Sequence, residues 1–212
     1  MKQKFLILGV LLFISNYAMS QKIDDQEPLY ARAGFKGGAN YTNITGDTDG
    51  AEGRVRVHLG VVVEYPISRN FLLQAELLYT AQGYKIEVEG EEQKINLNYF
   101  TLPLLAKFHI TNPLSIESGP QVGLLNGATN DAVENTDVFF DSFNSLEFSW
   151  AFGAGYKLKS GLFFQVRYNI GLTNINDTAV INIINNNAVA QLSIGYLFKT
   201  ENNRRIIQEF TE

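Results

Sequence analysis

The chain contains two histidines, His58 and His109, and they are the first candidates for catalysis. A histidine beside a serine can serve as the base of a nucleophilic hydrolase. Ser142 and Ser145 fall in a long predicted loop on the same side of the molecule as His58, which makes a lipid-modifying enzyme one hypothesis. Only the predicted topology connects these residues. The sequence therefore predicts no catalytic residue and no enzymatic activity.

A short acidic motif, Asp47-Thr-Asp-Gly50, is similar to the start of a calcium-binding loop. A loop of the EF-hand type requires glutamate at its twelfth position, and that position here is His58. We interpret the motif as an exposed acidic turn. The chain has no cysteine, which excludes thiolate zinc sites and disulfides. No phosphate-binding loop or dinucleotide fingerprint is present. The sequence thus predicts no metal and no cofactor.

Charged residues recur at positions of one parity within segments that are otherwise apolar. Charges of both signs are present at these positions. A charge that is removed from water must be paired or hydrogen-bonded. We therefore predict an internal network of ion pairs, made by Arg32, Lys36, Glu64, Glu76, Lys107, Glu117, Glu147, Lys157 and Arg167.

Segments with a period of two must position these charges. Apolar residues such as Phe164 alternate with polar residues such as Arg167, which is typical of a strand with one apolar face. Each segment is close to the ~9–11 residues that a tilted strand needs to cross a bilayer. Pro103 and Pro120 predict a bulge or a local break. The eight predicted strands are 31–42, 54–65, 71–82, 97–110, 114–124, 147–158, 162–172 and 188–198.

The predicted connections alternate in length. Three are short turns, at 66–70, 111–113 and 159–161. Outer-membrane barrels have short periplasmic turns and longer extracellular loops. The connections therefore predict an eight-stranded antiparallel up-and-down transmembrane β-barrel whose extracellular loops are acidic. The long loops are predicted at 43–53, 87–93, 126–145 and 173–187.

The volume of the side chains indicates which face of each strand points outwards. An eight-stranded barrel has an interior just wide enough for its own inward side chains. The bulky apolar face does not fit there, whereas the glycine-rich polar face does. We therefore predict an apolar exterior in lipid and a polar plug with no open channel. The alternative is a soluble sandwich of two sheets with its polar faces in water, which would leave edge strands to protect.

The N-terminal residues predict export. Lys2 and Lys4 precede an apolar run, and Ala18-Met-Ser20 forms a small-x-small cleavage site, which together are typical of a signal peptide over 1–20. We expect a polar leader over 21–30, the barrel over 31–199 and a polar tail over 200–212. The net charge of −5 argues against a nucleic-acid partner, because neutralising phosphates requires a basic surface.

Six motifs in order resemble the outer-membrane β-barrel domain of PorT-like proteins, a family of small exported barrels typical of Bacteroidota. The resemblance covers about residues 31–199 and implies an eight-stranded barrel in the outer membrane of a Gram-negative cell, without fixing an activity. The motifs are Gly34-Phe-Lys-Gly-Gly-Ala-Asn-Tyr-Thr-Asn-Ile-Thr-Gly46, Gln74-Ala-Glu-Leu-Leu-Tyr-Thr-Ala-Gln-Gly-Tyr-Lys85, Tyr99-Phe-Thr-Leu-Pro-Leu-Leu-Ala-Lys107, Gly119-Pro-Gln-Val-Gly123, Arg167-Tyr-Asn-Ile-Gly-Leu-Thr-Asn-Ile175 and Gly195-Tyr-Leu-Phe198.

The leading functional hypothesis is a porin-like barrel with a plugged lumen that is structural or binds a partner through its loops. The expected partners are outer-membrane lipid, lipopolysaccharide, and an unidentified protein or surface ligand at the loops. The alternatives are an accessory component of outer-membrane transport or protein secretion, and the lipid-modifying enzyme considered above.

Overall fold

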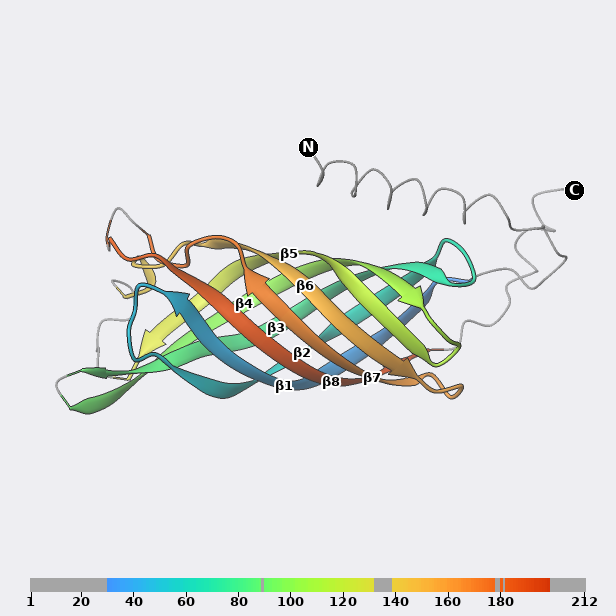
Figure 1. Cartoon of the computed structure of the whole chain (residues 1–212), viewed down its shortest axis with the longest axis horizontal. Helices are drawn as coiled ribbons and strands as arrows, with labels where there is room; N and C mark the ends of the chain where they lie inside the picture. The colour runs from blue at the N-terminus through green and yellow to red at the C-terminus, as the bar shows by residue number, and fades with distance from the viewer. Residues whose placement is uncertain (1–29, 89, 132–138, 178–179, 181, 199–212) are drawn as a thin grey trace, which may run out of the picture.

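Eight antiparallel strands close into one barrel in the computed structural model, which describes residues 30–88, 90–131, 139–177, 180 and 182–198. Each strand pairs with its sequence neighbours, and β1 also pairs with β8 (Figure 1). This arrangement confirms the predicted fold class. The strands are β1 (Arg32–Gly46), β2 (Glu52–Pro66), β3 (Phe71–Val88), β4 (Glu91–His109), β5 (Leu114–Asn130), β6 (Leu146–Lys157), β7 (Leu162–Gly171) and β8 (Asn185–Leu197).

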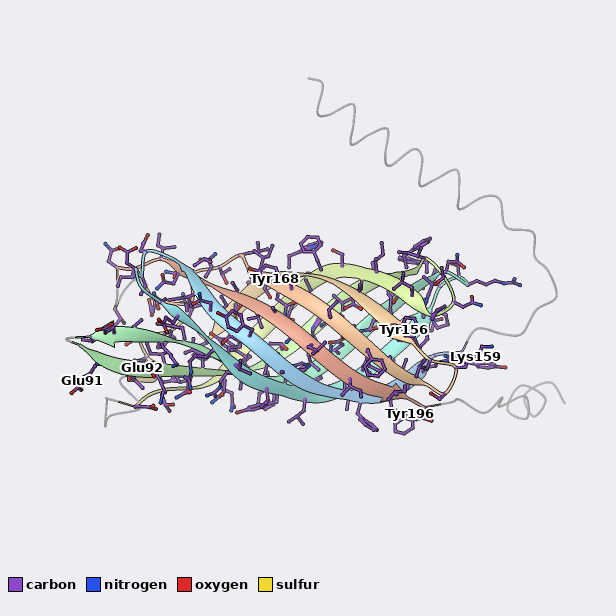
Figure 2. The ribbon with its side chains drawn as sticks, turned by 60° about the horizontal axis from the view of Figure 1, so that its bottom comes forward. Glu91, Glu92, Tyr156, Lys159, Tyr168 and Tyr196 are labelled. Carbon is purple, nitrogen blue, oxygen red and sulfur yellow. The ribbon has the colours of Figure 1, made fainter. Side chains whose placement is uncertain are left out.

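The outer wall of the barrel is apolar and the lumen is largely polar, which confirms the predicted assignment of the faces. Val61, Leu77 and Phe152 are each more than half exposed, whereas charged lumen residues such as Glu76 are almost fully buried. Figure 2 shows Tyr156 and other aromatic side chains on the outside of the ribbon. Such a surface is the inverse of a water-soluble protein, so it requires a hydrocarbon environment.

Glycines allow the strands of this narrow barrel to approach closely. A Cβ atom on Gly38 would collide with the backbone oxygen of Leu192 on β8, and one on Gly60 would collide with that of Leu77 on β3. The glycines on the inward face therefore do more than leave room for charged side chains, because they permit the close contact of neighbouring backbones.

The two ends of the barrel differ in their connections. At one end, called the turn end here, the connections are 67–70, 110–113 and 158–161. At the other, called the loop end, they are 47–51, 89–90, 131–145 and 172–184. The predicted long loops at 43–53 and 87–93 are therefore wrong for most of their residues. Strand pairing continues to Val88 and Glu91, and a β3–β4 hairpin projects beyond the barrel (Figure 1).

Of the bulge or local break predicted at the two prolines, the structure has a local break in the ladder and no bulge. Pro103 lies within a continuous β4, and the pairs Ala75↔Leu104 and Leu78↔Thr101 on either side of it share one register. Pro120 pairs with Trp150 in the β5–β6 ladder without a shift. A missing N–H removes rungs of the ladder there without changing its offset. The register shifts occur instead between Gly53 and His58, and between Asn98 and Tyr99.

Three predicted segments lie outside the described residues or nearly so: the signal peptide over 1–20, the leader over 21–30 and the tail over 200–212. Among the described residues, no helix is long and apolar enough to cross a membrane.

Candidate functional site in the lumen and at the loop end

The lumen near the turn end contains a carboxylate, Glu64 of β2, that faces two lysines. Lys107 Nζ on β4 lies 2.6 Å from Glu64 Oε1, and Lys157 Nζ on β6 lies 3.2 Å from Oε2. Lys107 also donates to Gln74 Oε1 at 3.0 Å and lies 5.9 Å from the centroid of the Phe163 ring. Two cations thus share one carboxylate in this group.

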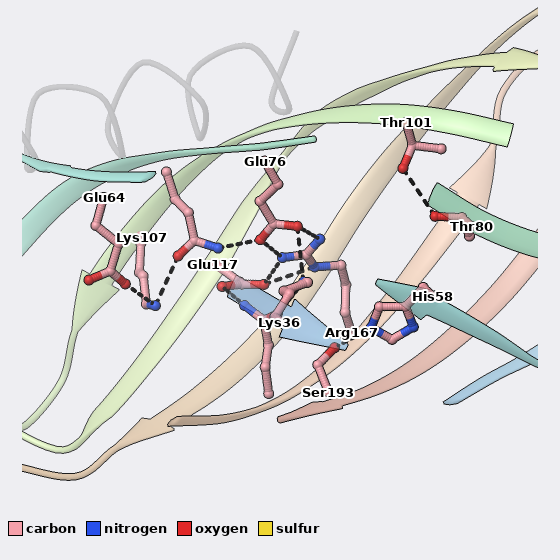
Figure 3. A network of polar contacts seen from close by, with 12 residues as sticks. Lys36, His58, Glu64, Glu76, Thr80, Thr101, Lys107, Glu117, Arg167 and Ser193 are labelled. Atoms are coloured by element: carbon pink, nitrogen blue, oxygen red, sulfur yellow. Dashed lines mark hydrogen bonds and ion pairs between the residues drawn. The ribbon is translucent and has the colours of Figure 1, made fainter. Parts of the chain in front are cut away.

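A second group lies deeper in the lumen and is centred on Arg167 of β7 (Figure 3). Its Nη1 and Nη2 atoms donate to Glu76 on β3 at 2.9 and 2.7 Å, and its Nε donates to Glu117 on β5 at 2.9 Å. Lys36 Nζ on β1 lies 2.9 Å from Glu76 Oε2 and donates to Gln165 at 2.6 Å. The four charged side chains are no more than 1% exposed.

Gln74 joins the two groups, because it accepts from Lys107 and donates to Glu76. The pair Arg167–Glu76 connects β7 to β3, which are opposite strands in a ring of eight. Ion pairs of this kind tie opposite walls together and occupy the space between them. Each of the strands β1 to β7 supplies one charged member, in the order Lys36, Glu64, Glu76, Lys107, Glu117, Lys157 and Arg167.

Two predicted members of the network do not join it. Arg32 is exposed at the first residue of β1, and no ion pair involves it among the described residues. Glu147 is buried, but its partner is the amide of Asn187, whose Nδ2 donates to Oε2 at 2.8 Å. Glu147 lies six residues along β6 from Gly153, the pairing partner of Glu117, which is about 20 Å of strand. The parity of a residue predicts which face of the strand it lies on but not its position along the barrel axis. The predicted ion pair of Glu147 is therefore wrong.

The predicted fully polar lumen needs a second correction at the loop end. Leu97 and Tyr99 on β4 are fully buried there, and they form an apolar cluster with loop residues such as Phe143. We call this cluster the apolar cap. In the sequence, Leu97 has the same parity as the inward residue Tyr99, which indicates that apolar side chains point into the lumen here. Its members are Ile44, Tyr84, Ile95, Leu97, Tyr99, Leu125, Ala128, Phe143 and Ile175.

His58 lies in the lumen and does not contact the loop serines that were considered as its partners. Its Nδ1 is 2.7 Å from Asn40 Oδ1, and its Nε2 is 2.8 Å from Ser193 Oγ. Asn40 Nδ2 donates to the backbone oxygen of Ala81, which leaves Oδ1 to accept from His58 Nδ1–H. Ser193 then donates to Nε2. This is the hydrogen-bond order of a Ser–His–Asn hydrolase, but His58 is 1% and Ser193 3% exposed.

We expect Ser193 to be chemically inert, because no substrate reaches a serine that the barrel wall encloses. Folded protein treated with a fluorophosphonate reagent should give no labelled Ser193 by mass spectrometry, and Ser193→Ala should give the same background. Labelling of Ser193 that disappears in His58→Ala would contradict this expectation and revive the lipid-modifying hypothesis.

The acidic motif Asp47-Thr-Asp-Gly50, interpreted above as an exposed turn, has a structural role. Asp47 Oδ2 accepts from the backbone N–H of Ile184 at 2.9 Å, and Thr48 Oγ1 accepts from Asn185 Nδ2 at 2.8 Å. These contacts fasten the β1–β2 turn to the β7–β8 connection. The described residues contain no cluster of three or more metal-ligating side chains, and the acidic turn is held by protein donors.

A family model described as "outer membrane protein beta-barrel domain" matches residues 19–177, which is well over half of the chain. The chain belongs to this family. Its barrel is similar to Neisserial surface protein A, at 13% identity and a TM-score of 0.49 over 81% of this chain and 99% of that one. It is also similar to the attachment invasion locus protein Ail of Yersinia pestis, at 12% identity and a TM-score of 0.45 over 80% and 100%. A comparison with curated proteins gives no match.

Membership places this outer-membrane barrel in the Gram-negative outer membrane. In such barrels the short turns are periplasmic, so the loop end is extracellular. The β3–β4 hairpin at this end is acidic, with Glu91 and Glu92 at its tip (Figure 2). Lys85 Nζ donates to Glu92 at 2.9 Å, and this hydrogen bond lowers the pKa of Glu92. An open hollow of about 320 Å³ lies beside the hairpin, lined by residues that include Glu52, Lys85 and Glu87.

Proposed function

We propose that this outer-membrane barrel is a non-conducting scaffold that presents a partner-binding surface outside the cell. The observation that carries the proposal is the occupied lumen. Ion pairs from seven strands fill its middle and periplasmic part, and the apolar cap closes its extracellular end. A hydrated solute would have to separate buried ion pairs, and separating such a pair leaves uncompensated charges that cost several kcal/mol.

The surface offered to a partner is the acidic β3–β4 hairpin with the hollow beside it. Strand pairing continues to Val88↔Glu91, so the hairpin is held by its own ladder as it leaves the membrane. Its exposed carboxylates favour a partner with positive charge, such as a basic protein segment or a cationic surface ligand. The PorT-like subtype, with its link to secretion, remains a prediction from the sequence motifs.

Planar bilayers test the non-conducting state. The refolded barrel should give no discrete current steps under an applied potential, whereas an open porin in the same bilayers should conduct. Steps of regular size from the pure barrel would contradict the scaffold and favour the transport alternative.

Charge variants test the partner surface. The triple variant Glu87→Gln, Glu91→Gln, Glu92→Gln should fold normally but lose partners that the wild-type barrel retains in a pull-down from outer membranes. The matched control is Asp141→Asn, an exposed acid at the same end that does not line the hollow. A triple variant that keeps every partner, or a control that loses the same ones, would contradict the assignment of the surface.

A further inference from the structure

Two arginines on β2, Arg54 and Arg56, form no direct ion pair among the described residues, although Glu92 and Asp131 lie close enough to interact with them electrostatically. Arg54 Nη1 donates to Ile95 O at 3.1 Å and to Asn96 Oδ1 at 2.9 Å. Arg56 donates from Nη1 to the same Asn96 Oδ1 and from Nη2 to Asn98 Oδ1 at 3.3 Å. No carboxylate of the described residues forms an ion pair with either guanidinium. The side-chain oxygen of Asn96 thus accepts from both guanidinium groups and holds these two positive charges side by side.

The contacts place both guanidinium groups on the outer wall. Asn96 and Asn98 have the outward parity of Phe100, because the residues between them point into the apolar cap. In the register they face Gly83 and Ala81 of β3, so the arginine side chains must cross β3 at these two small residues. Ala81 also has outward parity, yet it is only 4% exposed, as expected if a neighbouring side chain covers it.

The register shift in β2 explains how inward positions reach the outside. Between Gly53 and His58 the strand advances five residues, while its partner β3 advances four, from Tyr84 to Thr80. An extra residue of this kind bends the strand and redirects its side chains. Parity alone assigns Arg56 to the lumen, and the bulge accounts for its position on the wall.

The arginine pair sits at the extracellular edge of the apolar band. Arg54 is the third residue of β2 after the extracellular turn, and below it Val57, Leu59 and Val61 are exposed on the lipid-facing wall. The rings of Tyr79 and Phe100 pack edge to face at 5.7 Å nearby on the same wall. Aromatic side chains of this kind belong to the membrane interface, where lipid head groups lie.

We propose that Arg54 and Arg56 bind the phosphate groups of a phosphorylated glycolipid in the outer leaflet. Each guanidinium retains N–H donors beyond those used by Asn96, Asn98 and Ile95, and the fork geometry of arginine suits bidentate contacts to phosphate. An anion between them would offset the repulsion of the two charges. This site borders the acidic hairpin, because Arg54 contacts Ile95 and Asn96 of β4, but its proposed ligand goes beyond the scaffold function.

Native mass spectrometry of the refolded barrel in detergent tests the site, with bisphosphorylated lipid A as the probe. The wild type should bind this probe about a hundredfold more tightly than the double variant Arg54→Gln, Arg56→Gln, because each arginine loses a charge-assisted hydrogen bond that corresponds to about a tenfold change in affinity. The control Arg32→Gln, Arg69→Gln makes the same change of charge at the periplasmic end and should bind like the wild type.

Two further arms identify the ligand group. Dephosphorylated lipid A should bind the wild type and the double variant with the same low affinity. Phosphatidylglycerol should bind the wild type at least tenfold more weakly than bisphosphorylated lipid A does. Equal binding of lipid A by the wild type and the double variant, an equal loss in the control, or equal affinity for phosphatidylglycerol would overturn the proposal. If the glutamine variant does not fold, Arg54→Lys with Arg56→Lys keeps the charge but removes the fork, and unchanged affinity there would also overturn it.

Discussion

Replacing Arg167 with leucine is expected to lower the free energy of unfolding of the barrel by about 3–5 kcal/mol, the usual cost of removing one partner from a buried ion pair. Arg167 donates to both Glu76 and Glu117, and all three side chains are buried. The variant leaves two carboxylates facing the one ammonium group of Lys36. Equilibrium unfolding in urea, with the protein folded in lipid vesicles, measures the change.

Two companion variants separate the ion pair from a general loss of packing. Lys159→Leu removes a cation from an exposed periplasmic turn, so its effect should stay within about 0.5 kcal/mol. Arg167→Leu combined with Glu117→Gln restores one cation for one carboxylate between Lys36 and Glu76, and it should regain part of the lost stability. A double variant no more stable than Arg167→Leu alone would show that charge balance does not govern the lumen.

A charge on the outer wall should be costly according to its depth. Leu77 lies in the membrane-crossing part of β3, opposite Val61, and both side chains are about half exposed on the apolar wall. Leu77→Arg is expected to destabilise the folded state by about 2–4 kcal/mol, the range for arginine near the middle of a bilayer. The same unfolding titration in vesicles gives the value.

The control for depth is Thr45→Arg. Thr45 has the outward parity of Tyr41 and is exposed, but it lies near the end of β1 in the extracellular part of the barrel. The expected cost there is about 0–1 kcal/mol. Equal costs at the two positions, or no cost at Leu77, would mean that the wall around Leu77 does not face hydrocarbon.

The sequence was sufficient to predict which face of each strand points inwards. The period of two repeats in every strand, and a narrow barrel holds only the glycine-rich polar face, so residues such as Lys36, Glu76 and Arg167 could be assigned to the lumen in advance. The period of two does not predict how far along the barrel axis a side chain lies. Height depends on the stagger between strands, and for this reason Glu147 was given an ion pair that it does not have.

Local deviations from ideal pairing account for the other differences. The bulge that turns Arg54 and Arg56 onto the outer wall depends on pairing across β1, β2 and β3, where Asn40 and Thr42 of β1 reach backbone oxygens of β3. No residue type near this position in the sequence predicts the bulge. Pro103, by contrast, predicts a local break, and the ladders lose rungs beside it while the register stays unchanged. The apolar cap could have been predicted from Leu97, because this apolar residue has the same inward parity as Tyr99.

Trp150 provides the most direct test of the claim that the apolar face meets lipid and the charged face fills the lumen. It is the only tryptophan in the chain and lies on the outer wall, 39% exposed, between Phe148 and Phe152. Its fluorescence in vesicles should be strongly quenched by lipids brominated on their acyl chains. The variant Trp150→Phe, Phe163→Trp moves the fluorophore to a buried lumen position and should escape quenching. Unquenched Trp150, or equal quenching at both positions, would contradict the account.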